Sequence, residues 1–175
     1  AAATSVRLEG TTEDGDQQAT VVVEVEPGPR ATIGEGDVLG ADPLGLAARE
    51  ERELQVGDPL RQSVIDAAVR RLRRGYREQG YLEVEVGSEI EPVREGVWRV
   101  TLNLDPGRQK HIAEISITGR RHVSMSVLRD GLEVAEGEVA TPSEIGESVL
   151  QIAGFAPIER VDLETRDVGP DTVAL

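Results

Sequence analysis

The side chains that most often carry out catalysis or bind metals are few in this chain. It contains two histidines, His111 and His122, and no cysteine, so a metal site would have to combine one histidine with carboxylates. The absence of cysteine also excludes disulfides and thiolate ligands. The serines lie in no Gly-x-Ser-x-Gly pattern, and the glycines form no phosphate-binding loop. We therefore expect no catalytic residue, no metal and no cofactor, and a protein that is not an enzyme.

Carboxylates are abundant, with 33 acidic residues against 19 arginines and lysines. In so acidic a chain, closely spaced carboxylates arise by chance and do not by themselves indicate a site. One such run, Glu13-Asp14-Gly15-Asp16, suits either a calcium loop or a hairpin loop built on Asp-Gly. No regular series of ligands follows this run, so the hairpin loop is the favoured interpretation.

The net charge of −14 argues against nucleic acid as a partner, because nucleic-acid binding needs a basic surface. The exception to this acidity is a cluster of arginines on one predicted helix: Arg70, Arg71, Arg73, Arg74 and Arg77. Arg70, Arg73, Arg74 and Arg77 are a candidate docking face for anionic headgroups or an acidic partner. The alternative is a solvated helix face, stabilised by cations near the C-terminal end of the helix dipole.

The sequence also contains an internal repeat. The segment Val21–Gly40 aligns without gaps with Val100–Gly119, an offset of 119 − 40 = 79 residues. Both copies alternate apolar and polar residues, continue through a Pro-Gly turn, and end at a glycine. A repeat of this length predicts like-folded units of about 75–80 residues arranged in tandem.

The elements of the first unit follow from hydrophobic period and from capping signals. Residues 1–27 predict a hairpin whose polar turn covers 11–18. A strand at 31–39 precedes two helices, which we expect to start at Asp42-Pro43 and Asp58-Pro59 and to end near Gly57 and Gly80. A strand at 82–86, a long polar turn at 87–96 and a strand at 98–104 complete a β-α-α-β-β unit.

The second unit repeats this order over a shorter length. We expect a strand at 112–117, a helix over 123–132 and a second helix that starts at Pro142. A strand at 158–163, a turn at 167–171 and a returning strand at 172–175 follow.

A three-stranded sheet covered on one face by two helices leaves two edge strands. Their unpaired N–H and C=O groups can take up an extended segment of another chain. The alternative is an edge protected by acidic side chains, which are present in both candidate strands. The residues predicted to bind a partner strand are Leu82, Glu83, Val84, Glu85, Val86, Ile158, Val161 and Leu163.

Four motifs resemble those of POTRA domains in the outer-membrane assembly and surface-antigen family, which includes the BamA-type and TamA-type proteins. They are Leu72-x3-Tyr76-x3-Gly80-Tyr81-x2-Val84, Val100-x-Leu102-x-Leu104-Asp105-Pro106-Gly107, Ile112-x2-Ile115-x-Ile117-x-Gly119 and Leu128-Arg129. The resemblance covers about residues 20–175. The second helix of the second unit departs from the pattern: it is shorter, and no tyrosine precedes Gly154.

The resemblance implies an α+β fold of tandem POTRA modules, each with a three-stranded mixed sheet whose last strand is central. It implies that residues 1–29 are the C-terminal hairpin of a preceding module, 30–106 a complete module, and 107–175 a second module truncated near its last strand.

The resemblance also implies a location in the periplasm of a Gram-negative bacterium, attached to the outer membrane through a β-barrel C-terminal to this chain. The expected partners are unfolded outer-membrane protein precursors, accessory lipoproteins, and other POTRA modules of the same chain. The alternative is a structural spacer, as in POTRA-bearing division proteins or two-partner secretion transporters.

Overall fold

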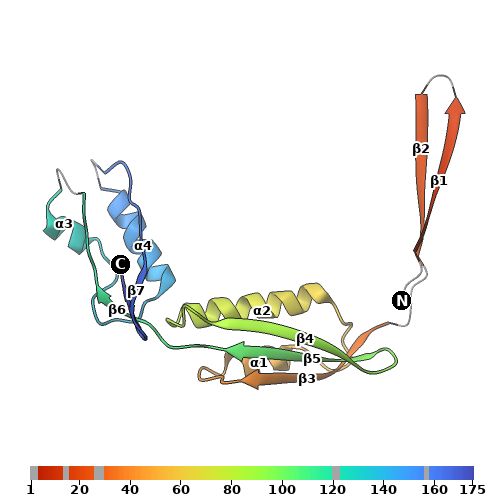
Figure 1. Ribbon diagram of the computed structural model, residues 1–175, viewed down its shortest axis with the longest axis horizontal. Coiled ribbons are helices and arrows are strands. Elements are labelled where there is room, and N and C mark those ends of the chain that lie inside the picture. Colours follow the sequence, from red (N-terminus) through yellow and green to blue (C-terminus); the bar gives the residue numbers. More distant parts are fainter. Residues whose placement is uncertain (1–3, 14–15, 26–29, 120–122, 156–157) are drawn as a thin grey trace.

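The computed structural model describes residues 4–13, 16–25, 30–119, 123–155 and 158–175, with residues 4–25 described as backbone alone. Figure 1 shows a hairpin followed by two units that each combine a small sheet with two helices. Within the described residues, both units have the element order β-α-α-β-β. The predicted α+β fold of tandem modules is therefore confirmed.

The N-terminal hairpin consists of β1 (Thr4–Glu13) and β2 (Asp16–Val25), paired antiparallel from Thr4↔Val25 to Glu13↔Asp16. The predicted hairpin is confirmed, but the predicted turn at 11–18 is too long. Threonines in this stretch are β-branched and suit an extended backbone, so the ladder continues through them. The calcium interpretation depends on Asp14 and Gly15, which lie outside the described residues.

The first module is built on a mixed sheet with its last strand in the centre. It comprises β3 (Thr32–Gly40), α1 (Leu46–Glu53), α2 (Gln62–Arg77), β4 (Glu85–Arg94) and β5 (Val97–Asp105). The strand order is β3-β5-β4, with β3 parallel and β4 antiparallel to β5. One face of the sheet packs on the helices, and the buried residues of this core are Ile33, Ala47, Leu54, Ile65, Leu72, Tyr76, Val84, Val86, Val100, Leu102 and Leu104.

Both helices of this module begin later than the sequence predicted. Asp42 and Pro43 precede α1 by a turn, and Gly45 at φ 68° is the residue before the helix. The Asp42 carboxylate still caps α1, because it accepts a hydrogen bond from the Ala48 amide at 2.9 Å. Its other oxygen accepts a hydrogen bond from the Tyr76 hydroxyl, which ties the start of α1 to α2.

The segment before α2 is extended rather than helical. Pro59 forms a β-bridge with Thr32, and the Leu60 amide donates to the Ala31 carbonyl at 2.9 Å. The second module repeats this arrangement at Val139, which bridges His111. Pairing with the first strand therefore takes precedence over the Asp-Pro start signal.

The second module has the same topology with shorter elements. It comprises β6 (His111–Glu114), α3 (Met125–Asp130), α4 (Pro142–Ala153), β7 (Arg166–Gly169) and β8 (Thr172–Ala174), and its strand order is β6-β8-β7. Its core contains Ile112, Val134, Ala140, Ile145 and Val173. The Gly137 amide donates to the Ile112 carbonyl just as Gly57 donates to Ile33, so the sequence repeat is also a structural one.

Two predicted strand positions are wrong. The edge strand β4 covers Glu85–Arg94, so residues 87–94 belong to a strand and not to a turn, and Tyr81–Val84 is a turn closed by the Val84 amide on the Tyr81 carbonyl. The polar residues join the sheet because β5 offers a partner at each position.

In the second module, Ile158, Val161 and Leu163 lie outside any strand, and β7 begins at Arg166. The strand starts later than predicted because Arg166, opposite Ala174, is the first residue that pairs with β8.

Candidate interaction surfaces

The C-terminal end of α2 forms one half of a joint between the two modules. The Tyr81 amide donates to the Tyr76 carbonyl and the Gly80 amide to the Arg77 carbonyl, at 3.1 and 2.9 Å, which is a Schellman ending with Gly80 at φ 81°. The Gly80 carbonyl then accepts a hydrogen bond from the Lys110 amide of the second module at 2.8 Å. A Cβ on Gly80 would overlap Val139 and lie 3.1 Å from the Lys110 carbonyl oxygen, so only glycine fits this contact.

Lys110 places a buried positive charge at the same joint. Lys110 is only 3% exposed. Its Nζ lies 2.9 Å from Asp167 Oδ1 in β7 and 3.3 Å from Glu83 Oε1 in the first module. The hydrogen bond to Asp167 and the one to Glu83 raise the pKa of Lys110, although desolvation opposes them. The ammonium group therefore remains charged and bridges a carboxylate from each module.

Further contacts cross the joint. Glu78 Oε2 accepts a hydrogen bond from the Ser143 amide at 3.3 Å, in the first turn of α4. Thr141, the N-cap residue of α4, makes no side-chain capping bond, so Glu78 supplies from the first module an acceptor at the positive end of the helix dipole. Leu82 packs against the core of the second module. Two residues predicted to bind a partner strand, Leu82 and Glu83, thus contact the neighbouring module.

The outer edge of β4 is the second surface. Arg73 Nη2 donates to the Val86 carbonyl at 3.1 Å, so the backbone groups of Val86 point away from β5. Antiparallel strands alternate inward and outward backbone groups, which places those of Ser88 and Ile90 outward as well. Pro92 has the same parity and has no N–H to donate, as expected at a sheet edge. Ser88 and Ile90 are therefore the positions between Val86 and Pro92 at which both the N–H and the C=O point outward with no partner among the described residues.

The two faces of β4 differ in character. Val86 is buried in the core and Ile90 packs against it, on the side of the helices. Glu85, Glu89 and Glu91 are exposed on the opposite face. A strand lying beside β4 would therefore meet apolar surface on the helix side and carboxylates on the other.

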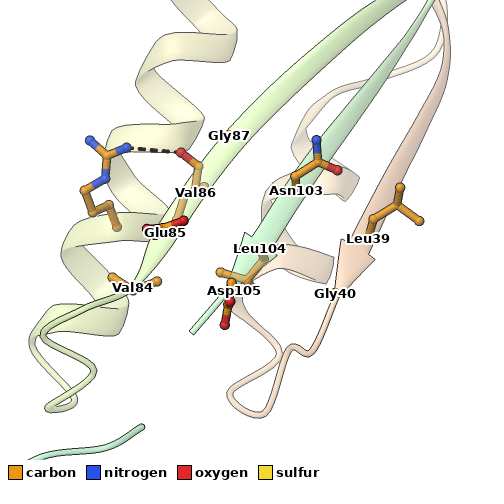
Figure 2. A pocket seen from close by; sticks show the side chains of 10 residues that line it. Leu39, Gly40, Val84, Glu85, Val86, Gly87, Asn103, Leu104 and Asp105 are labelled. Carbon is orange, nitrogen blue, oxygen red and sulfur yellow. Dashed lines mark hydrogen bonds between the residues drawn. The ribbon is translucent and has the colours of Figure 1, made fainter. Parts of the chain in front are cut away.

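An open hollow of about 740 Å³ adjoins the start of β4 and the ends of β3 and β5. Figure 2 shows Leu39, Asn103 and Asp105 on one side and Glu85 and Val86 on the other, with the bond to the Val86 carbonyl drawn dashed. Its lining residues are Leu39, Gly40, Arg73, Val84, Glu85, Val86, Gly87, Asn103, Leu104 and Asp105. The hollow is wide and shares Arg73 and Val86 with the edge, so it suits a polypeptide segment better than a small reactant.

The arginines of α2 point in different directions. Arg71 turns toward α1 and binds Glu50 at 2.6 Å, while Arg73 turns toward β4. Arg70, Arg74 and Arg77 are exposed on the side of α2 opposite the core. The docking role of Arg70, Arg73, Arg74 and Arg77 remains a prediction.

In the described part of the chain, no three His, Asp or Glu side chains gather in a way that could hold a metal ion. None of the helices described is both long enough and apolar enough to cross a membrane.

Comparison with known proteins identifies the fold of the first module. Residues 47–107 match the POTRA family, described as "Surface antigen variable number repeat". By this match, the first module is similar to a POTRA domain. The match covers both helices, β4 and β5 of the first module, including the edge and the Gly80 ending. No curated protein sequence matches the chain.

Solved structures extend this fold to both modules. POTRA domains 3–5 of BamA from Haemophilus influenzae share 19% identity at a TM-score of 0.62, over 99% of this chain and 70% of that one. BamA from Haemophilus ducreyi lacking POTRA domains 1–3 shares 18% identity at a TM-score of 0.67, over 82% of this chain and 28% of that one. POTRA domains 1–2 of the periplasmic domain of Omp85 from Anabaena share 13% identity at a TM-score of 0.52, over 85% and 94%. The resemblance to POTRA domains is confirmed.

Sequence reasoning missed the joint, Lys110 above all. One signal was available, because Lys110 is the only lysine in the sequence. A single lysine among many arginines marks a position where a compact ammonium group suits the surroundings better than a planar guanidinium.

Proposed function

We propose that this chain is the periplasmic POTRA region of an outer-membrane barrel assembly or translocation protein. Its first module binds extended segments of unfolded outer-membrane proteins or accessory subunits by strand addition along β4. The observation that carries this proposal is the pair of unoccupied edge positions, Ser88 and Ile90, between the bond at Val86 and Pro92. The similarity to BamA and to the periplasmic domain of Omp85 supports the placement.

The same likeness supports the remaining assignments. We propose that the β1–β2 hairpin completes a preceding module that ends at residue 29, and that the two modules meet at residues 106 and 107. A membrane barrel would follow the second module.

The faces of β4 define the chemistry of the partner. Alternate side chains of an added strand would pack toward α2, where apolar residues lose the most contact with water. The others would lie beside Glu89 and Glu91, where cross-strand pairing favours lysine or arginine. The site therefore favours an extended segment in which apolar and basic residues alternate.

A titration with two synthetic peptides tests this proposal. A peptide of alternating valine and lysine should shift the backbone NMR signals of β4, and one of alternating valine and glutamate should bind more weakly.

The variant Ser88→Pro removes one outward N–H without breaking a bond to β5, and Ser88→Ala keeps that N–H. We expect Ser88→Pro to weaken binding of the valine–lysine peptide by about tenfold, as the loss of a hydrogen bond and the strain beside it imply. Equal binding by both variants would contradict strand addition at this edge.

The joint between the modules favours a second function, that of a spacer of fixed geometry. Gly80, Glu78, Glu83 and Lys110 together connect the modules through backbone, helix cap and ion pair. Because the chain has no cysteine, spin labels can be placed at Ser63→Cys and Glu147→Cys, one exposed position in each module.

A narrow distance distribution that broadens in Lys110→Met but not in the exposed control Arg108→Met supports a fixed spacer. A broad distribution in the unaltered chain would argue against it.

A further inference from the structure

Arg73 differs from the neighbouring arginines in what it binds. Arg71 pairs with carboxylates of α1, whereas Arg73 donates across to a main-chain carbonyl of β4 at 3.1 Å. That carbonyl belongs to Val86 and lies on the free edge of the sheet, where an added strand would otherwise donate its own N–H. The guanidinium group therefore occupies one of the positions that strand addition would use.

This contact and Pro92 limit the edge from its two ends. At Pro92 an added strand finds a carbonyl but no N–H, and at Val86 it finds the carbonyl already bonded. The freely available positions are Ser88 and Ile90, which limits the registers in which a partner can first pair. Because a one-residue slip would turn every side chain of the partner to the other face, register also decides which residues meet α2.

The bond at Val86 is also easy to exchange. The Arg73 side chain is exposed, so its guanidinium can bind water when it leaves. A partner N–H replaces it one for one at the carbonyl, so no backbone group is left without a hydrogen bond. Net hydrogen-bond energies of exposed groups are small, because water competes for both partners.

We propose that Arg73 is a displaceable latch that closes the Val86 end of the β4 edge and restricts first pairing to Ser88 and Ile90. This inference rests on the proposed strand addition and adds its regulation: a partner pairs at the open positions first and extends to Val86 by displacing the guanidinium. In the free protein, the latch shortens the edge that is exposed to unwanted pairing.

The test compares Arg73→Met with Arg74→Met, an exposed neighbour on the same helix. Both variants remove one positive charge and keep an unbranched chain, so the general attraction for the valine–lysine peptide changes equally. We expect Arg73→Met to bind this peptide about 3- to 10-fold more tightly than Arg74→Met, the range that one hydrogen bond implies. Amide exchange with peptide bound should show protection of the Val86 N–H in Arg73→Met that exceeds the protection in Arg74→Met.

The outcomes separate the latch from the binding function. If the peptide binds all forms and Arg73→Met binds no more tightly than Arg74→Met, the latch is wrong and strand addition stands. If Arg73→Met binds more weakly, Arg73 holds the partner instead of excluding it, and the latch is again wrong. If the peptide binds none of the forms, the proposed function fails and the latch fails with it.

Discussion

Replacement of Gly80 by alanine should separate the two modules with little effect on either fold. Gly80 is left-handed at φ 81°, and the added Cβ would overlap Val139 and approach the Lys110 carbonyl oxygen to 3.1 Å. Gly57 is a matched control, because it has φ 95° and an added Cβ there has nothing within 4 Å. The two substitutions impose the same backbone strain, and only one of them disturbs the joint.

The expected losses of stability follow from two costs, the strain of a left-handed alanine and the steric overlap at the joint. A left-handed alanine costs about 1–2 kcal/mol, and both variants carry this cost. Forcing an extra methyl group into a packed contact costs about 1–3 kcal/mol more, and only Gly80→Ala carries that second cost. The backbone strain is confined to the turns that follow α2 and α1, whereas the overlap can be relieved by moving the second module away.

Hydrogen exchange of the full chain distinguishes the two effects. In Gly80→Ala the Lys110 and Ser143 amides, which donate across the joint at 2.8 and 3.3 Å, should exchange faster than in Gly57→Ala. The fluorescence of Trp98, the only tryptophan and part of β5, should report a folded first module in both variants. Equal exchange of the two amides in the two variants would refute the joint as described.

Two further predictions concern carboxylates. Glu78→Ala should destabilise the second module by about 0.5–1 kcal/mol through loss of the α4 cap, measured as earlier thermal loss of its NMR signals; the exposed Glu147→Ala on the same helix should not. Burial acts to raise the pKa of Asp42, but hydrogen bonds from Tyr76 and from the amides of α1 outweigh it and lower that pKa. Its stabilisation is therefore present above the unfolded value of about 4 and disappears as pH falls through the lower folded value. The stability difference between the unaltered chain and Asp42→Ala in thermal melts should shrink on acidification, and a difference that grows toward low pH would contradict this sign.

The central strands were predictable because their signal is local. Val100, Leu102 and Leu104 alternate with polar residues, and all three are buried. The Gly80 ending was predictable for the same reason, since a glycine after an amphipathic helix favours a left-handed C′ residue.

Features that depend on distant partners could not be read from the sequence. The acidic stretch with Gly87 and Pro92 has the composition of a turn, and it is a strand because β5 pairs with it residue by residue. Leu82 and Glu83 continue the alternation of a strand. In the structure, however, Leu82 packs against the core of the second module and Glu83 pairs with Lys110. The helical periodicity placed Arg73 on the solvent side of α2, and only the length of its side chain brings it to the sheet edge.

The most direct test of the account measures amide exchange along β4 with and without the valine–lysine peptide. The account predicts added protection at Ser88 and Ile90, whose N–H groups point outward, and no change at Gly87 and Glu89, which already pair with β5. Protection without this alternation, or protection confined to α2, would contradict strand addition at the β4 edge.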